Sequence, residues 1–353
     1  MCYNLRVANT KPYWQIIFDM KVTLMDSFIF ALGAVAPIVL MVVIGYILKR
    51  MGWMNERFAK EANKIVFRVL MPVMLFVKIY GMNDFSGFDP MFIGYAVIAL
   101  LIVFALSIPA SIMVAREKNR RGVLIQAAVR SGYSLIGIPL AESLYGAEGA
   151  MAATILSAAV IPLFNVLAVI SLTAIGNDSK KKPSVGKIIL DIIKNPLIIG
   201  IVTALVMVLI RGVFVNAGIS FRLSNIGPLF TVLNYLSNMA IPLALLVLGA
   251  QFEFSAVASL KREIIFGVVV RVVVVPAFAL GIAYFFFRNH FTAAQFATFV
   301  ALFATPVAVP SVPMVQEMGG DVTLAGQLVV WSTLVSAITV FIVTFLLRLG
   351  GAF

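Results

Sequence analysis

Acidic residues, cysteine and histidine are scarce in this 353-residue chain. It contains 15 Asp and Glu residues, one Cys (Cys2) and one His (His290). A single Cys excludes an intramolecular disulfide, and a single His excludes a metal site built from several His side chains. Charged residues make up 12% of the chain, which is about half of their usual share in a soluble domain. A water-soluble enzyme of this size is therefore excluded.

Motifs of common enzyme chemistry are also missing. The sequence has no His-Glu-x-x-His zinc motif, no Gly-rich phosphate loop ending in Lys-Ser/Thr and no nucleophile elbow. We expect no enzymatic activity, no cofactor and no bound metal. His290 lies beside Arg288 after an apolar segment, and we expect it in a solvated loop.

Apolar residues dominate what remains. They make up 62% of the chain, and the mean hydropathy is +1.05. A membrane-spanning helix needs roughly 20 mostly apolar residues. The sequence predicts ten spans, of which 122–145, 229–251 and 293–318 are interrupted by Pro, Gly and polar residues. The ten are 27–49, 62–80, 91–115, 122–145, 147–175, 196–211, 229–251, 264–287, 293–318 and 324–347. The fold class is therefore an all-α polytopic membrane protein.

The basic residues predict how the chain is oriented in the membrane. The segments after the first, third, fifth and seventh spans carry 17 Lys and Arg, and the opposite side, with both termini, carries 8. Cytoplasmic loops are enriched in Lys and Arg, so we expect both termini on the non-cytoplasmic side of a bacterial inner membrane. The net charge of +12 is interpreted as loop charge, not as a nucleic-acid surface.

The first residues, 1–26, do not fit this plan. They contain Lys11-Pro12 and no apolar run long enough for a signal peptide. We interpret them as an N-terminal extension, with Met25 or Met20 as the true start. A structured amphipathic extension is the alternative.

Landmarks of the first half recur in the second half. The repeated features are a Pro-Leu-rich segment followed by Phe-Ser, a later Pro, and a Ser or Thr eight residues before another Pro. They occur at Pro72–Val77 with Phe85-Ser86, Pro109, and Ser131 with Pro139, and again at Pro242–Val247 with Phe254-Ser255, Pro276, and Thr305 with Pro313. Five spans per unit is an odd number, so the second unit must enter the membrane from the other side, as in many secondary transporters. The predicted units are 27–175 and 187–353, joined by a cytoplasmic linker at 176–186.

Two spans predict a binding site. Residues 130–139 and 305–313 are rich in Gly and Pro, which tolerate or force a break in an α-helix. Broken helices at equivalent positions of two repeats are typical of a substrate site at the middle of the membrane. Simple kinks are the alternative. The candidate substrate-binding residues are Arg130, Ser131, Tyr133, Gly137, Pro139, Asn165, Asn238, Thr305, Pro306, Pro310, Ser311 and Pro313.

Two arginines lie within predicted spans. A cation at this depth costs about 2.5–3.5 kcal/mol on insertion scales, so it usually faces a cavity or a partner. Arg130 is expected to bind an anionic substrate, and Arg271 could bind substrate or have a structural role. Pairing with Glu142, Glu253 or Glu317 is the alternative for both. Gln126, Asn234 and Gln327 are further polar candidates, although such residues also join helices to each other.

Motifs throughout the chain resemble the auxin efflux carrier family, which includes plant PIN carriers and bacterial organic-anion permeases. The resemblance begins near Phe28 and covers almost the whole chain. Its motifs are Gly45–Arg50 with Gly52-Trp53, Asn63 to Pro72 with Leu75-Phe76, Arg130-Ser131 with Gly137–Leu140 and Leu144–Gly146, Pro162 with Asn165, Ile241–Leu245 with Leu248–Ala250, Thr305-Pro306, Gly319–Asp321 and Ser332–Ser336. Relatives often have Asn shortly after the Arg of the fourth helix, where this chain has Gly132.

The resemblance implies ten helices in two inverted repeats, as in bile-acid symporters and sodium/proton antiporters. It also implies a scaffold that is often dimeric, and a transport domain whose fourth and ninth helices cross at the substrate. We therefore expect a transporter of small organic anions, such as malonate, malate or indole-type carboxylates, with an elevator-like mechanism and a homodimeric state. The alternatives are a sodium-coupled symporter of the same fold and a membrane solute sensor without flux.

Overall fold

The computed structural model describes residues 33, 36–81, 89–176, 186, 190, 193–217 and 222–352, and these are helical apart from loops and one isolated β-bridge. The predicted N-terminal extension and nearly all of the linker lie outside the described residues. Among the described helices, six are long and apolar enough to cross a membrane: Pro90–Val114, Tyr133–Ile175, Pro196–Val215, Gly227–Gln251, Lys261–His290 and Val322–Leu349. These helices agree with a polytopic membrane protein, whereas the ten-span inverted repeat stays a prediction.

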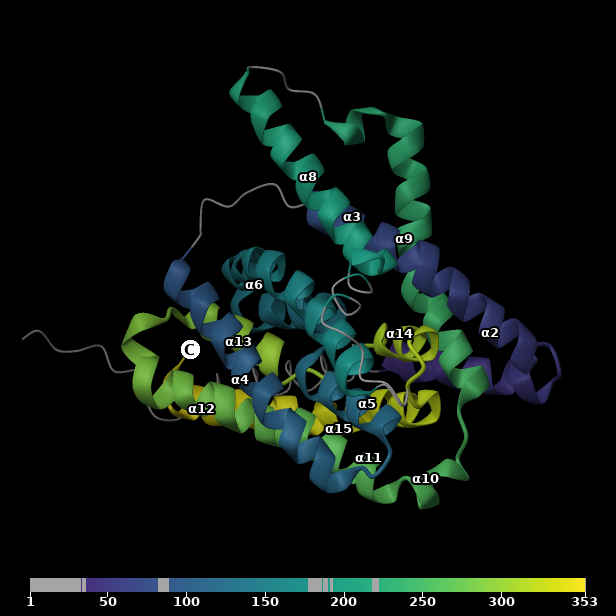
Figure 1. Ribbon diagram of the computed structural model, residues 1–353. Helices are drawn as coiled ribbons and strands as arrows, with labels where there is room; N and C mark the ends of the chain where they lie inside the picture. The colour runs from purple at the N-terminus through teal and green to yellow at the C-terminus, as the bar shows by residue number, and fades with distance from the viewer. Residues whose placement is uncertain are drawn as a thin grey trace, which may run out of the picture.

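The helices follow in chain order, with short π-helical turns between some of them (Figure 1). Residues 36–50 form the first described helix. The labelled elements are α2 (Glu56–Ile65), η1 (Val66–Leu70), α3 (Met71–Tyr80), α4 (Pro90–Val114), α5 (Lys118–Val129), η2 (Tyr133–Gly137), α6 (Ile138–Ile170), η3 (Ser171–Ile175), α8 (Pro196–Asn216), η4 (Leu223–Asn225), α9 (Gly227–Gln251), α10 (Ala256–Ser259), α11 (Lys261–Val269), η5 (Val270–Val274), α12 (Val275–Phe287), η6 (Arg288–His290), α13 (Ala293–Phe303), α14 (Ser311–Glu317) and α15 (Val322–Leu349).

Polar side chains begin several of these helices. Asn55, Asp89, Asn195 and Asp321 each accept a hydrogen bond from a backbone N–H of the first turn of α2, α4, α8 and α15, respectively. Such caps satisfy donors that have no partner within the helix. In α4 and α8 a Pro follows the cap directly, where its missing N–H costs nothing.

Prolines also explain three of the π-helical turns. The turns η1, η2 and η5 end two residues before Pro72, Pro139 and Pro276. Pro cannot donate to the carbonyl four residues before it. The helical turn before each Pro contains one extra residue. The N–H of the residue directly before the Pro then reaches the carbonyl five residues earlier. The sequence analysis placed these prolines in spans but did not predict the wider turns.

The long helix α6 contains a sharp turn. Tyr145 and Gly146 have non-helical backbone angles, with φ of 59° at Gly146. This conformation suits Gly because it has no Cβ. The turn falls between the predicted spans 122–145 and 147–175, so the chain reverses where the sequence analysis placed a boundary. Gly319, with φ of 75°, occupies the corresponding turn between α14 and α15.

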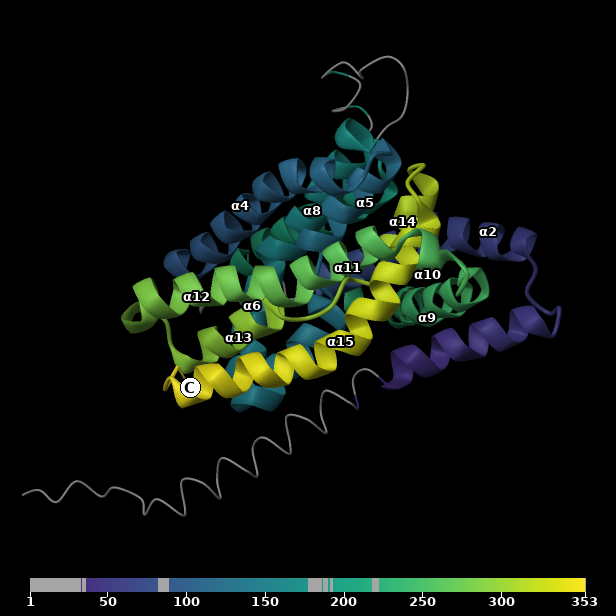
Figure 2. The same cartoon turned by 90° about the horizontal axis from the view of Figure 1, so that it is seen from below.

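The helices pack in two groups. The first group contains helix 36–50, α2, α3, α8 and α9, and the second contains α4–α6, α11–α13 and α15. The first group occupies the upper and right part of Figure 1. Within it, Gly45 and Gly249 bring helix 36–50 and α9 into backbone contact, because a Cβ on either would lie about 2 Å from a carbonyl oxygen of the other helix. The short helix α14 contacts α2 and α9 of the first group and α5 and α15 of the second (Figure 2).

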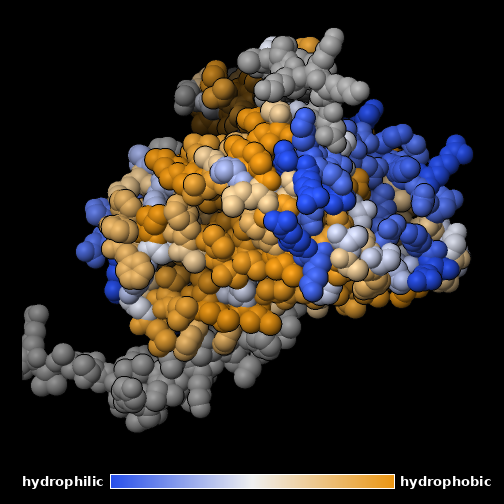
Figure 3. Space-filling model, turned by 60° about the horizontal axis from the view of Figure 1, so that its bottom comes forward, coloured by the Kyte–Doolittle hydropathy of each residue, from blue (hydrophilic) through white to orange (hydrophobic). Residues whose placement is uncertain are grey.

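Apolar side chains cover much of the outside of the molecule. Figure 3 shows a broad apolar surface, with hydrophilic residues gathered mainly at the right and a smaller group at the left edge. Exposed apolar side chains include Leu106 and Met113 on α4, Leu209 on α8, and Phe285 on α12. A contiguous surface of this kind on a helical protein is the surface that a lipid bilayer covers.

Candidate functional site

The two predicted breaks are present in the structure. Helix α5 ends at Val129, and helical structure resumes at Tyr133 with the π-helical turn η2, followed by α6 from Ile138. Helix α13 ends at Phe303 and α14 begins at Ser311. Both interruptions are complete breaks, so the alternative of simple kinks is wrong.

The two broken segments meet in a short antiparallel contact. Ser131 and Val307 face each other in an isolated β-bridge. Backbone hydrogen bonds flank this pair, from Gly132 N to Pro306 O (2.8 Å) and from Ala308 N to Arg130 O (3.1 Å). The hydroxyl of Ser332 on α15 also accepts a hydrogen bond from the N–H of Val307 (3.0 Å). Backbone groups that lost their helical partners are thus paired inside the protein, as the membrane interior requires.

Arg130 is buried beside this contact. Its side chain donates to Asn165 Oδ1 (3.0 Å) and to the thioether of Met314 (3.0 Å). Asn165 in turn donates to the carbonyl of Ile161 (2.8 Å), which directs its carbonyl oxygen toward the guanidinium. No ion pair among the described residues involves Arg130, so the alternative of pairing with a carboxylate is not seen in this part of the chain. Its charge is balanced by one amide oxygen and a weak sulfur acceptor.

Arg271 has a different environment. Its side chain is fully buried and donates to four backbone carbonyls, those of Thr305 (2.8 Å), Ala128 (3.0 Å), Leu302 (3.0 Å) and Phe303 (3.1 Å). These carbonyls lie at the C-terminal ends of α5 and α13. All three nitrogens of this guanidinium therefore have protein acceptors.

A small cavity of about 40 Å³ lies at the contact between the broken segments. Arg130, Ser131, Tyr133, Asn165 and Pro310, all predicted site residues, contribute to its wall. The hydroxyl of Ser131 is buried and has no hydrogen-bond partner, and the same is true of Ser311 at the start of α14. Buried hydroxyls are normally paired, so this region holds polar groups that a ligand could satisfy.

A larger cavity of about 640 Å³ adjoins the small one. Both are lined by Ile38, Met74, Leu135, Ile136 and Ile241. The predicted residues Pro139 and Asn238 line the larger cavity, together with Lys78, whose ammonium lies 3.4 Å from the carbonyl of Ser134. Lys78 is one of the eight basic residues that the sequence analysis counted on the non-cytoplasmic side, and its place in the cavity was missed. The signal was its position two residues before the end of the predicted span 62–80.

The remaining predicted residues line neither cavity; they are Gln126, Gly137, Asn234, Arg271, Thr305, Pro306, Ser311, Pro313 and Gln327. Several have contacts within the protein that occupy their polar groups. The amide of Gln126 donates to Met314 Sδ (3.4 Å), that of Gln327 to Glu253 O (2.7 Å), and the hydroxyl of Thr305 to Ala301 O (2.9 Å). Their predicted contact with substrate stays a prediction.

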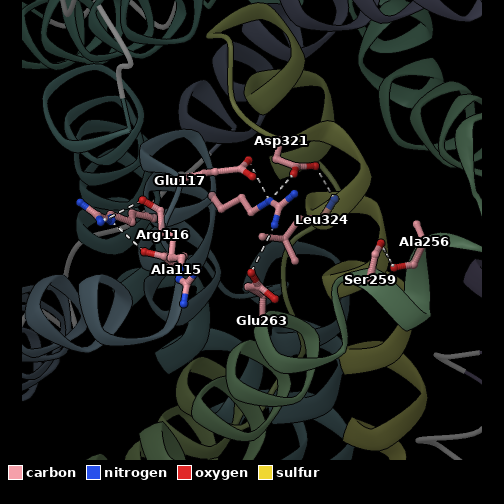
Figure 4. Close-up of polar contacts among 10 residues, drawn as sticks. Ala115, Arg116, Glu117, Ala256, Ser259, Glu263, Asp321 and Leu324 are labelled. Carbon is pink, nitrogen blue, oxygen red and sulfur yellow. Dashed lines mark hydrogen bonds and ion pairs between the residues drawn. The ribbon is translucent and has the colours of Figure 1, made fainter. Parts of the chain in front are cut away.

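A charged cluster joins the helices that carry the site. Arg120 on α5 forms ion pairs with Glu117 (3.2 Å), with Glu263 on α11 (3.3 Å) and with Asp321 (3.0 Å), which caps α15. Figure 4 shows the three carboxylates around one guanidinium. This cluster ties together three helices of the second group at one end.

The apolar surface and the six long apolar helices among the described residues are those of an integral membrane protein. Residues 30–344 match the family model described as "Membrane transport protein". The chain belongs to this family, that of the auxin efflux carriers. The resemblance inferred from the sequence motifs is thus confirmed, and the protein is a membrane transporter by family.

Two archaeal relatives support the same class. A protein of Methanothermobacter thermautotrophicus, described as an uncharacterized transporter, is 24% identical over 86% of this chain and 94% of its own length. Another uncharacterized transporter, from Methanocaldococcus jannaschii, is 27% identical over 70% of this chain and 77% of its own length.

Proposed function

We propose that this protein carries small organic anions across the membrane, by secondary-active or facilitative transport, and that Arg130 binds the anionic group. The comparison of the two buried arginines carries this proposal. Arg271 has four carbonyl acceptors, whereas Arg130 has one amide oxygen and one thioether. A buried cation with so few acceptors favours an anionic partner, and the cavity beside it is where that partner would lie.

The surrounding groups suit a carboxylate. The unpartnered hydroxyl of Ser131 lines the small cavity and can donate to a carboxylate oxygen. Charge-assisted hydrogen bonds of this kind are among the strongest in proteins. Lys78 in the larger cavity adds positive charge along an approach to Arg130. The other residues lining that cavity are mainly apolar, which suits a carboxylate with an apolar body.

Alternating access would follow from movement of the second helix group against the first. Helix α14 carries the contacts that such a movement has to change. Gln316 at its end accepts hydrogen bonds from Asn63 on α2 and from Gln251 on α9, and Glu317 forms an ion pair with Arg68 (3.1 Å). The proposed architecture is two inverted repeats of five helices in a homodimer, with both termini outside the cytoplasm. The order helix, break, helix and positive-φ Gly, seen at Gly146 and again at Gly319, supports the repeat.

Thermal stabilisation of the purified protein by carboxylates tests the anion site. We expect malonate, malate or indole-3-acetate to raise the melting temperature of the wild type and to have no effect on Arg130→Ala. The matched control is Arg262→Ala, because Arg262 is exposed and donates to one carbonyl, that of Met113. Equal stabilisation of Arg130→Ala and the wild type would exclude Arg130 from the site.

Flux measurements separate the alternatives. Counterflow of the stabilising anion in proteoliposomes identifies a transporter, whereas binding without counterflow identifies a solute sensor. Uptake that requires a sodium gradient identifies a sodium-coupled symporter. In each of these cases, loss of the measured binding or flux in Arg130→Ala would support Arg130 as part of the anion site.

A further inference from the structure

Arg271 connects the ends of two helices that belong to different parts of the chain. Ala128 belongs to the last turn of α5, Leu302 and Phe303 end α13, and Thr305 follows two residues later. The guanidinium donates to the carbonyls of all four. It therefore bridges both broken segments from one side.

The acceptors of Arg271 are groups that need such a donor. The last carbonyls of an α-helix have no partner within the helix, and the helix end carries about half a negative charge. Two such ends meet here, away from water. The planar guanidinium of Arg has five N–H donors in a fixed arrangement, whereas a Lys ammonium has three on a single atom. Only Arg can reach acceptors on both helix ends with fixed geometry.

These carbonyls lie next to the residues of the anion site. Ala128 precedes Arg130 by two residues, and Thr305 directly precedes Pro306, whose carbonyl accepts from Gly132. Fixing the two helix ends therefore sets the register of the contact from which the Arg130 side chain projects. A shift of one end relative to the other would displace Arg130 from the cavity.

We propose that Arg271 is a positioning residue that holds the ends of α5 and α13 together and so places Arg130 for anion binding, without itself contacting the anion. This inference rests on the proposed function for its effect on binding. Its effect on the contact between the broken segments does not depend on any ligand, and the two effects are measured separately.

Disulfide formation across the β-bridge measures the contact. Cys2 is the single Cys of the chain, so Cys2→Ser provides a background for the pair Ser131→Cys and Val307→Cys. Residues that face each other in an antiparallel pair lie about 4.5–5.5 Å apart between Cα atoms, within the range that a disulfide spans. We expect oxidation to be at least tenfold slower when Arg271→Lys is added. The control is Arg262→Lys, on α11 of the same helical segment Lys261–His290, which we expect to oxidise at the rate of the background.

Binding is measured without the introduced Cys pair. We expect the dissociation constant for malonate or indole-3-acetate, whichever stabilises the wild type, to rise at least tenfold in Arg271→Lys and to stay unchanged in Arg262→Lys. Size-exclusion and circular dichroism profiles matching the wild type establish that the variants are folded. Arg271→Gln, which retains two donors, is the second variant if Arg271→Lys does not fold.

Each outcome decides the proposal. Unchanged oxidation in the folded variant would overturn it, whatever the binding result. If binding were weaker all the same, Arg271 would act on the anion directly. Slower oxidation with unchanged binding would show that the contact does not place Arg130. If the wild type binds none of the tested carboxylates, the anion site is refuted. Slower oxidation in Arg271→Lys would still establish that Arg271 holds the two helix ends together. Failure of both variants to fold would assign Arg271 to folding alone and overturn the proposal.

Discussion

Replacing Asn165 by Asp would place a carboxylate against Arg130 within the protein. Asn165 Oδ1 accepts from the guanidinium at 3.0 Å, and Asp has nearly the same shape as Asn. Two opposite unit charges at this separation attract by about 5.5 kcal/mol at an effective dielectric constant of 20. The new carboxylate would compete with any external anion for Arg130.

The expected result is a large loss of anion affinity in a protein that still folds. Desolvation of the new carboxylate offsets part of the attraction, and a remaining difference of about 3 kcal/mol corresponds to roughly a hundredfold change in affinity. We therefore expect Asn165→Asp to raise the dissociation constant for the stabilising carboxylate about a hundredfold, measured by titration calorimetry. Its thermal stability without ligand should stay close to that of the wild type, because the ion pair with Arg130 offsets the lost hydrogen bond from the Asn165 amide to Ile161 O.

Asn238→Asp is the matched control. Asn238 is exposed and lines the larger cavity, so this change adds the same charge without direct contact with Arg130. We expect a much smaller loss of affinity, below about tenfold, from screened repulsion. If Asn165→Asp binds the carboxylate as tightly as the wild type does, Arg130 is not the partner of the anion, and the reasoning from the two arginines fails.

Two further predictions concern stability. Gly249→Ala should destabilise the purified protein by about 1–3 kcal/mol in chemical unfolding, because its Cβ would lie 2.0 Å from Val42 O; Gly281→Ala, with nothing within 4 Å, should be neutral or stabilising, and equal effects would exclude the close helix contact. Asp321→Ala should cost about 1–2 kcal/mol in the same assay, because it removes the α15 cap and an ion pair. Glu117→Ala removes one half-exposed partner and should cost less than about 1 kcal/mol; a larger effect than that of Asp321→Ala would contradict the assigned roles.

The membrane helices and their breaks were accessible from the sequence because both depend on local composition. Runs of apolar residues specify spans in any membrane protein. The Pro and Gly of 130–139 and 305–313 cannot form a continuous helix, and the structure breaks both segments there. The turn at Gly146 was likewise marked by a boundary between two apolar segments. The inverted repeat and the count of ten spans are not established by the described helices.

The partners of the polar residues were less predictable. The sequence analysis considered Glu142, Glu253 and Glu317 as partners of the two arginines, because carboxylates can be recognised in a sequence. Arg271 instead donates to backbone carbonyls, and every residue has a carbonyl. Only the three-dimensional arrangement of the helix ends shows which of these carbonyls lack a donor within their own helix. Lys78 was missed for a related reason, since a Lys at the end of a span is usually a loop charge.

The two buried arginines together favour an anion over a cation as the ligand. The negative ends of α5 and α13 meet beside Arg271, which supplies donors to their last carbonyls. Arg130 then remains beside the cavity with one amide oxygen and one thioether, and the described ion pairs do not include it. A cation entering the cavity would add a second charge with few acceptors, in a region where each uncompensated charge costs several kcal/mol. An anion has the opposite effect, because it pairs with Arg130 and lowers the free-energy cost of burying that cation. The proposal of an anionic ligand therefore rests on Arg271 having its own acceptors, which leaves Arg130 as the less well compensated cation.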